Sequence, residues 1–175
     1  MHLNYEFKAS CDDPALIENI LLKQEPVFAG TDHQVDTYFN VPNGRLKLRE
    51  GNIENALIQY HRENIAGAKT SHVILYKTNP GSSLKNALVN ALGIKVVVDK
   101  KRKIYFIENV KFHLDEVAGL GTFVEVEAID AEGNIGLDKL KSQCNGYAHL
   151  FGIRENQFIA ASYSDLLMAK KSSTS

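Results

Sequence analysis

Apolar and polar residues alternate along most of this chain. These alternating segments are rich in Val, Ile, Tyr, Phe and Thr and are bounded by Gly, Pro, Asn or Asp, which is typical of β-strands separated by turns. The sequence therefore predicts roughly eight strands, most of them joined to the next as hairpins. The segments are residues 2–9, 34–40, 44–50, 55–63, 71–78, 94–108, 110–117 and 121–130.

A different spacing, of three and four residues between apolar positions, predicts helices over 12–23, 82–93, 137–152 and 162–170. Asp12 or Asp13 followed by Pro14 is typical of a helix start. Because the strands occur in runs and do not alternate one by one with helices, the order favours an α+β fold with an antiparallel sheet. We expect one domain over residues 1–168 and a disordered tail over 169–175, where "KKSSTS" ends the chain.

Charged residues on the predicted strands are sorted by sign. In "GRLKLRE" the alternation places Arg45, Lys47 and Arg49 on one side, and in "FVEVEA" it places Glu125 and Glu127 on one side. For any one strand, a solvated outer face is the simpler interpretation. The sorting argues against it, because a face that only has to be soluble usually mixes both signs.

A closed sheet gives these charges another place to lie. A barrel of about eight strands can hold one small ligand, and an interior lined with Arg, Lys and Glu would require a polyanion and a metal ion for neutralisation. Paired carboxylates suit a hard dication such as Mg²⁺ or Mn²⁺. Triphosphate chemistry requires this combination. Further residues in the same phase are Asn4, Glu6 and Lys8 in "NYEFK", Lys100 and Arg102 in "DKKRKIYF", and Arg62 in "IQYHRE".

Six motifs in order along the chain resemble one known family: "NYEFK", "DTYF", "GRLKLRE", "KKRKIYF", "HLDEVAGLGTFVEVE" and "LDKLKSQCNGYAHLFGI". Together they are similar to the CYTH superfamily, the triphosphate tunnel metalloenzymes, and within it most similar to the class IV adenylyl cyclases. The resemblance implies a closed antiparallel eight-stranded β-barrel, or tunnel, with helices packed outside. It also implies a nucleoside triphosphate or inorganic polyphosphate as ligand, with Mg²⁺ or Mn²⁺ as cofactor.

The resemblance also assigns roles by position. It implies that a set of basic residues contacts the triphosphate and acts in catalysis: Lys8, Arg49, Arg62, Lys100 and Arg102, with Arg45 and Lys47 as further substrate-binding residues. It implies that four carboxylates hold metal: Glu6, Asp115, Glu125 and Glu127. The strand-face assignment agrees for all of them except Asp115, which rests mainly on its family position.

One position departs from the family pattern. The family signature is Glu-x-Glu-x-Lys, and the first Glu is replaced here by Asn4 in "NYEFK". An amide oxygen can still ligate a metal, but the loss of a negative charge should weaken the affinity for a hard dication. This substitution puts full activity, and a second metal above all, in question.

Several functions stay open on this basis. A cyclase that converts ATP to cyclic AMP and pyrophosphate is the first choice, and a tripolyphosphatase or thiamine-triphosphatase-like phosphohydrolase is the alternative. A third is a nucleotide- or polyphosphate-binding protein that has lost catalysis through Asn4. A lipocalin-like barrel for an apolar ligand is disfavoured by the charged inward faces.

Composition narrows the setting. The formal net charge of −1 gives no general attraction to nucleic acid or to an anionic membrane surface. No apolar run approaches the ~20 residues of a membrane helix, and we expect a cytoplasmic protein. Neither the histidines nor Cys11 and Cys144 have the spacing of a zinc site, and no glycine-rich phosphate loop occurs. A homodimer is possible by analogy with the related cyclases.

Overall fold

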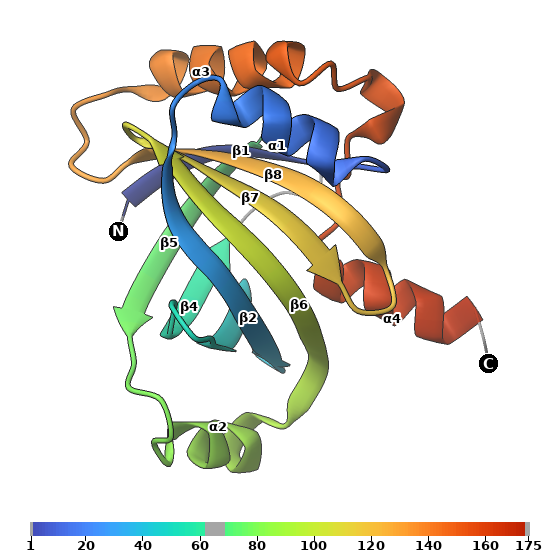
Figure 1. The fold of residues 1–175 in the computed structure, drawn as a ribbon. Coiled ribbons are helices and arrows are strands. Elements are labelled where there is room, and N and C mark those ends of the chain that lie inside the picture. Colours follow the sequence, from blue (N-terminus) through green and yellow to red (C-terminus); the bar gives the residue numbers. More distant parts are fainter. Residues whose placement is uncertain (1, 62–68, 174–175) are drawn as a thin grey trace.

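The computed structural model describes residues 2–61 and 69–173, and its centre is a closed antiparallel barrel (Figure 1). Neighbouring strands follow the order β1-β5-β4-β3-β2-β6-β7-β8, and β8 pairs with β1 to close the ring. The predicted fold class is therefore confirmed. The strands are β1 (His2–Ser10), β2 (Val27–Phe39), β3 (Arg45–Glu50), β4 (Ala56–His61), β5 (Lys69–Lys77), β6 (Ile94–Ile107), β7 (Val110–Val117) and β8 (Gly121–Asp130).

The second strand is longer than its sequence pattern predicted. We expected it over 34–40, but β2 begins at Val27 and pairs with β6 along nearly its whole length, from Val27 opposite Phe106 to Phe39 opposite Ile94. The register shifts between Phe28 and Gly30, so the first part of β2 does not alternate regularly. Pairing with a long neighbour, and not the local pattern, sets where this strand begins.

Helices surround the barrel: α1 (Pro14–Leu22), α2 (Leu84–Leu92), α3 (Leu137–Leu150) and α4 (Tyr163–Ser173), with a 3₁₀ turn at Glu155–Gln157. Asp13 begins α1, because its Oδ1 accepts the Leu16 N–H at 3.0 Å, as the Asp-Pro pattern predicted. Helix α4 continues to Ser173 and so occupies most of the segment that we expected to be a disordered tail. None of the helices in the described part of the chain is long and apolar enough to cross a membrane.

Two apolar cores lie on opposite sides of the barrel wall. The outer core lies where α1 and α3 cover β1, β7 and β8 (Figure 1), and Phe7, Phe112 and Leu140 are fully buried there. The second core fills one end of the interior, where Tyr163 of α4 packs with Phe123 and other inward residues. Alternation along each strand therefore sends one set of side chains under the helices and the other set into the barrel.

The buried face of α3 gives a direct test of the outer core. Leu140 is 0% exposed and Leu150, on the same helix, is 40% exposed. We expect Leu140→Ala to lower the free energy of unfolding by about 2 to 5 kcal/mol, because it leaves a cavity between α3 and the barrel. The matched change Leu150→Ala should cost less than about 1 kcal/mol. Urea unfolding followed by circular dichroism measures both, and equal effects would contradict this packing.

Candidate functional site

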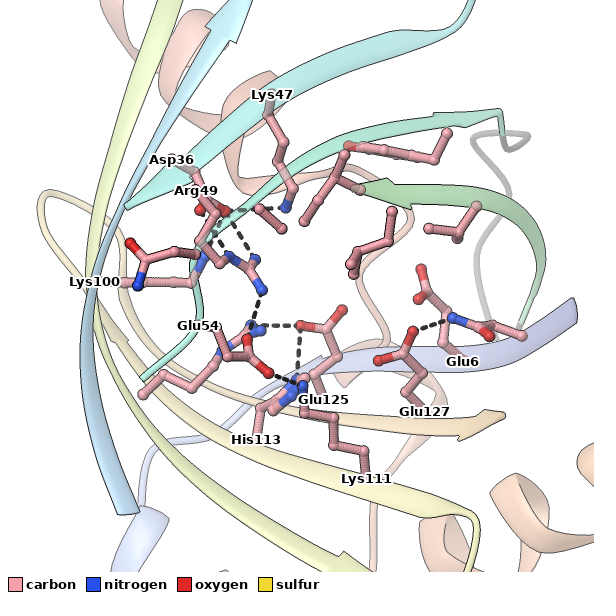
Figure 2. A pocket seen from close by; sticks show the side chains of 18 of the residues that line it. Glu6, Asp36, Lys47, Arg49, Glu54, Lys100, Lys111, His113, Glu125 and Glu127 are labelled. Atoms are coloured by element: carbon pink, nitrogen blue, oxygen red, sulfur yellow. Dashed lines mark hydrogen bonds and ion pairs between the residues drawn. The ribbon is translucent and has the colours of Figure 1, made fainter. Parts of the chain in front are cut away.

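A cavity of about 710 Å³ occupies the interior of the barrel, and most of its charged lining was expected from the sequence (Figure 2). It lies between the helix-covered strands and the sheet formed by β2 to β5. Its volume is typical of sites that bind a small molecule or a nucleotide. The charged residues that line it are Glu6, Lys8, Asp36, Lys47, Arg49, Glu54, Lys77, Lys100, Arg102, Lys111, Glu125 and Glu127.

Three cations on one wall converge on one carboxylate, Asp36 of β2. Lys47 Nζ donates to Asp36 Oδ2 at 3.0 Å and Lys100 Nζ at 2.8 Å. Arg49 donates through Nε to Oδ1 and through Nη2 to Oδ2, both at 2.9 Å. Figure 2 shows these four side chains together on one side of the cavity, and they are called the cationic wall below. The sequence predicted its three cations but missed Asp36.

The cationic wall carries more positive charge than Asp36 compensates. Burial disfavours the charged form of Asp36, but Arg49, Lys100 and Lys47 outweigh it and hold the pKa of this carboxyl well below its ordinary value. Burial lowers the pKa of Lys100 well below its ordinary value, and repulsion from Arg49 and Arg102 adds to this despite the attraction of Asp36. A bound polyanion would stabilise the charged form of Lys100, so the wall is complementary to an anion.

Arg102 is bound by Asp115, a carboxylate that we had predicted to be a metal ligand. Its Nε and Nη2 donate to the two oxygens of Asp115 at 2.6 and 2.5 Å, and Tyr163 Oη donates to the same carboxylate at 2.7 Å. Asp115 is 2% exposed and is not among the residues that line the cavity. In this geometry Asp115 orients Arg102, and it does not point toward a metal in the cavity.

The opposite wall carries paired carboxylates from adjacent strands. Glu6 of β1 lies directly across from Glu127 of β8, and Lys8 lies across from Glu125. Figure 2 shows Glu6 and Glu127 on the far side of the cavity from Asp36. Burial, together with repulsion from Glu6, raises the pKa of Glu127 to about 7. A cation between the two carboxylates would remove this repulsion.

The residues of this acidic wall fit a hard dication. Asn4 Nδ2 donates to Glu127 Oε1, which leaves Asn4 Oδ1 buried and without a hydrogen-bond partner. Glu6, Glu127 and Asn4 Oδ1 thus offer neighbouring oxygen ligands, which suit Mg²⁺ or Mn²⁺. No cluster of three or more His, Cys, Asp or Glu side chains arranged for a metal occurs in the described residues. Substrate phosphate and water would have to complete the coordination, as is usual for Mg²⁺.

Glu125 lies between the two walls. Arg102 Nη2 donates to its Oε2 at 2.8 Å, and His113 Nδ1 lies 3.6 Å from the same oxygen. Despite its burial, attraction by Lys8 and Arg102 holds the pKa of Glu125 well below its ordinary value. Burial and the nearby Arg102 lower the pKa of His113 to about 3, so this histidine is neutral near pH 7.

Two predicted cations need separate comment. Arg45 was expected to line the same cavity, but its Nη2 donates to Asp165 of α4 at 2.8 Å, and it lines a smaller neighbouring pocket. This prediction is wrong because α4 covers the end of the barrel where β3 begins. Arg62 lies outside the described residues.

Other lining residues were missed by the sequence analysis. Lys111 and the buried His113 share the inward phase of β7, so alternation could have identified Lys111. Asp36 lay in a quoted motif, and its inward phase was available too. No sequence signal marked Glu54, which is in the β3–β4 loop, or Tyr163, which is on a helix and has its ring 3.9 Å from Lys8 Nζ.

Apolar side chains line a further part of the cavity. They come from β4 and β5, where Ile58 lies opposite Leu75 and Tyr60 lies opposite Val73. These four residues are called the apolar wall below. A cavity with a cationic wall, an acidic wall and an apolar wall can hold a ligand that combines phosphates, a metal ion and an organic group.

The raised pKa of Glu127 predicts a pH-dependent stability in EDTA. Glu127 binds its proton more tightly in the folded chain, so its contribution to stability is lost as pH rises through about 7. Relative to that of wild type, the free energy of unfolding of Glu127→Gln should therefore increase by on the order of 1 to 3 kcal/mol as the pH is raised from ~5 to ~8. Urea unfolding at both pH values measures this gain. The same change at the exposed Glu116 is the control, and a Glu127→Gln gain no larger than the control's would contradict the assignment.

Solved structures resemble this chain over nearly its whole length. A Pyrococcus horikoshii protein superimposes with a TM-score of 0.76 at 22% identity, covering 95% of this chain and 99% of its own. A Vibrio parahaemolyticus protein, proposed to be an adenylate cyclase, gives a TM-score of 0.72 at 18% identity, covering 95% and 98%. A Hippeastrum protein, proposed to be an adenylyl cyclase and described as having a dominant triphosphatase activity, gives 0.61 at 15% identity, covering 97% and 96%. These likenesses show the fold.

The family follows from the sequence match. No curated protein matches the chain closely enough to count as a relative. The CYTH domain model, however, matches residues 2–161, which is nearly the whole chain and includes both charged walls. This match confirms the resemblance found in the six sequence motifs. Because the match covers so much of the chain, the protein belongs to the CYTH domain family.

Proposed function

We propose that this protein is a metal-dependent enzyme that acts on a nucleoside triphosphate inside the barrel, with cyclisation of ATP as its first candidate reaction. One observation carries the proposal: the three cations of the cationic wall share the single carboxylate of Asp36, and Glu6 lies directly across from Glu127 on the opposite wall. The surplus of positive charge on the first wall favours an anionic ligand, which is consistent with the lowered pKa of Lys100. The paired carboxylates on the second wall favour a cation, which is consistent with the raised pKa of Glu127. A metal-bound triphosphate satisfies both.

The basic residues supply the groups that triphosphate chemistry needs. Lys47 and Arg49 of β3 and Lys100 of β6 present charged N–H donors from the two strands that flank β2, and such donors bind phosphate oxygens and stabilise charge that develops on a leaving phosphate. Arg102 is fixed by its two bonds to Asp115 and therefore holds its orientation without cost during the reaction. A dication held by Glu6 and Glu127 would neutralise phosphate charge and polarise the phosphoryl group.

Cyclisation and hydrolysis differ in the nucleophile. In the first reaction the ribose 3′-oxygen attacks the α-phosphorus, the bond to the β-phosphate oxygen breaks, and pyrophosphate leaves. In the second reaction water attacks the terminal phosphorus, the bond from this phosphorus to the β-phosphate oxygen breaks, and the diphosphate leaves while orthophosphate forms. The apolar wall favours a substrate with a nucleoside over inorganic polyphosphate, because Ile58, Tyr60, Val73 and Leu75 offer surface that a base and a ribose can cover.

A second candidate is a nucleotide- or polyphosphate-binding protein that has lost catalysis, and Asn4 favours it. The Asn4 amide N–H donates to an oxygen of Glu127, so a metal that binds this oxygen must displace the hydrogen bond. A Glu at position 4 could not donate such a hydrogen bond. Weaker metal binding would slow any metal-dependent reaction while the cationic wall still binds phosphate. The triphosphatase activity described for the Hippeastrum protein is consistent with hydrolysis as the alternative.

Turnover assays test the proposal. We expect the protein, with Mg²⁺ or Mn²⁺, to convert ATP to cyclic AMP and pyrophosphate. Orthophosphate from ATP, tripolyphosphate or thiamine triphosphate would indicate the phosphohydrolase instead. Lys47→Gln should lower kcat/KM by about 10- to 100-fold, because it removes one charged contact to phosphate. Lys103→Gln is the matched control, since Lys103 pairs with Glu18 at 2.7 Å and does not line the cavity. No product from any substrate would refute the enzymatic proposal.

The metal site gives a separate prediction. Asn4→Glu should tighten Mn²⁺ binding by about tenfold or more, because it adds a third negative charge beside Glu6 and Glu127 and removes the amide donor. Calorimetric titration with Mn²⁺ alone measures this without turnover. The exposed Asn134→Asp adds the same charge outside the barrel and should leave the affinity unchanged. An equal or weaker affinity in Asn4→Glu would show that position 4 does not contribute to the metal site.

A further inference from the structure

One carboxylate in the cavity stands where a phosphate would be expected to bind. Glu54, in the loop between β3 and β4, accepts hydrogen bonds from Arg49 and Lys111, two cations that line the cavity (Figure 2). We propose that Glu54 is a specificity-determining residue, which competes with substrate phosphate for these two cations and so limits the length of the phosphate chain that the cavity accepts. This inference rests on the proposed function.

The contacts of Glu54 resemble those of a bound phosphate oxygen. Arg49 Nη1 donates to Glu54 Oε2 at 2.9 Å, and Lys111 Nζ contacts Glu54 Oε1 from the other side of the carboxylate. The attraction of Lys111 and Arg49 outweighs the effect of burial and holds the pKa of Glu54 far below its ordinary value, so the group stays charged. A substrate phosphate that reaches Arg49 or Lys111 must therefore compete with a permanently ionised carboxylate.

The loop that carries Glu54 is fixed in place by its own hydrogen bonds. The fully buried Asp32 accepts the backbone N–H groups of Ile53 and Glu54, both at 2.9 Å. Asn55 bonds the backbone of Gly51 in both directions, through its Oδ1 and its Nδ2. Gly51 is required here, because a Cβ at this position would lie 2.7 Å from Asp32 Oδ1. These hydrogen bonds therefore hold Glu54 in a fixed position in the lining of the cavity.

Gln34 completes this support. Its Nε2 donates to Asp32 Oδ2 at 2.8 Å and to Glu54 Oε2 at 3.0 Å, so it links the loop's anchor to the carboxylate itself. Gln34 is fully buried. A carboxylate that served only the solubility of the protein would not need a buried amide to orient it. The orientation of Glu54 toward the cavity is therefore a specific feature of this site.

Charge explains why Glu54 would affect the length of the accepted chain. Arg49 is shared between Asp36 and Glu54, so its positive charge is already balanced in the cavity. The lining residues that the structure describes include seven Lys or Arg side chains and five Asp or Glu side chains, a surplus of two positive charges. Each phosphate added to the chain brings further negative charge, with or without a bound dication, so chain length changes this balance in EDTA as well. A longer chain brings more negative charge than the cavity compensates while Glu54 is present.

Calorimetry in EDTA, where a metal-dependent reaction cannot proceed, tests the inference with inorganic tripolyphosphate and tetrapolyphosphate. For wild type we expect tetrapolyphosphate to bind no more tightly than tripolyphosphate. In Glu54→Gln, which keeps the acceptor oxygen for Gln34, the Kd for tetrapolyphosphate should fall at least tenfold and the Kd for tripolyphosphate by about threefold. Glu50→Gln is the matched control, because Glu50 pairs with Lys85 at 2.6 Å and does not line the cavity.

The outcomes separate this inference from the function on which it rests. Unchanged or weaker binding by Glu54→Gln would show that Glu54 only orients Arg49. An equal gain for both chain lengths would also overturn the length limit. If the variant does not fold, the wild-type comparison still decides, since clearly tighter binding of tetrapolyphosphate contradicts the proposal. If wild type binds neither polyphosphate, this inference fails, while the turnover assay with ATP and a dication still decides the proposed function.

Discussion

The charged side chains inside the barrel have to compensate one another, because a buried charge without a partner costs several kcal/mol. Closure of the sheet by β1 and β8 creates this constraint, since every inward residue then faces the interior and not solvent. The chain meets it with shared carboxylates. Asp36 compensates three cations, Glu54 compensates two, and Asp115 holds Arg102. The distribution of these ion pairs determines which charges in the cavity remain available to a ligand.

Compensation is incomplete on both sides of the cavity, and the imbalance has opposite signs. On the cationic wall, burial together with repulsion from Arg49 and Arg102 lowers the pKa of Lys100, and on the acidic wall burial together with repulsion from Glu6 raises the pKa of Glu127. A metal-bound triphosphate brings a negative charge to the first wall and a positive charge to the second. The helix-covered outer core keeps the strands in register while these charges remain inside.

The substitution at Asn4 changes one wall and leaves the other intact. A carboxylate there would increase the repulsion around Glu127, and the amide instead donates a hydrogen bond to it. This hydrogen bond relieves some of the repulsion around Glu127, and in the proposed function it would lower the metal affinity. The cations proposed to bind phosphate lie on β3 and β6, away from Asn4. Under this proposal, phosphate binding and turnover are separable properties of the barrel.

The sequence by itself determined the strands, most of the helices and the direction in which each strand residue points. This worked because alternation in a strand is a local property, so Glu6, Lys47 and Arg102 could be placed inside once a closed sheet was expected. Only the tertiary structure decided the partners. Lys100 reaches Asp36, Lys111 reaches Glu54, and Arg45 turns to Asp165, because strand register, loop conformation and the packing of α4 bring together residues that are far apart in the chain. Which charges remain available for a ligand depends on these pairings, and local sequence patterns contain no information about them.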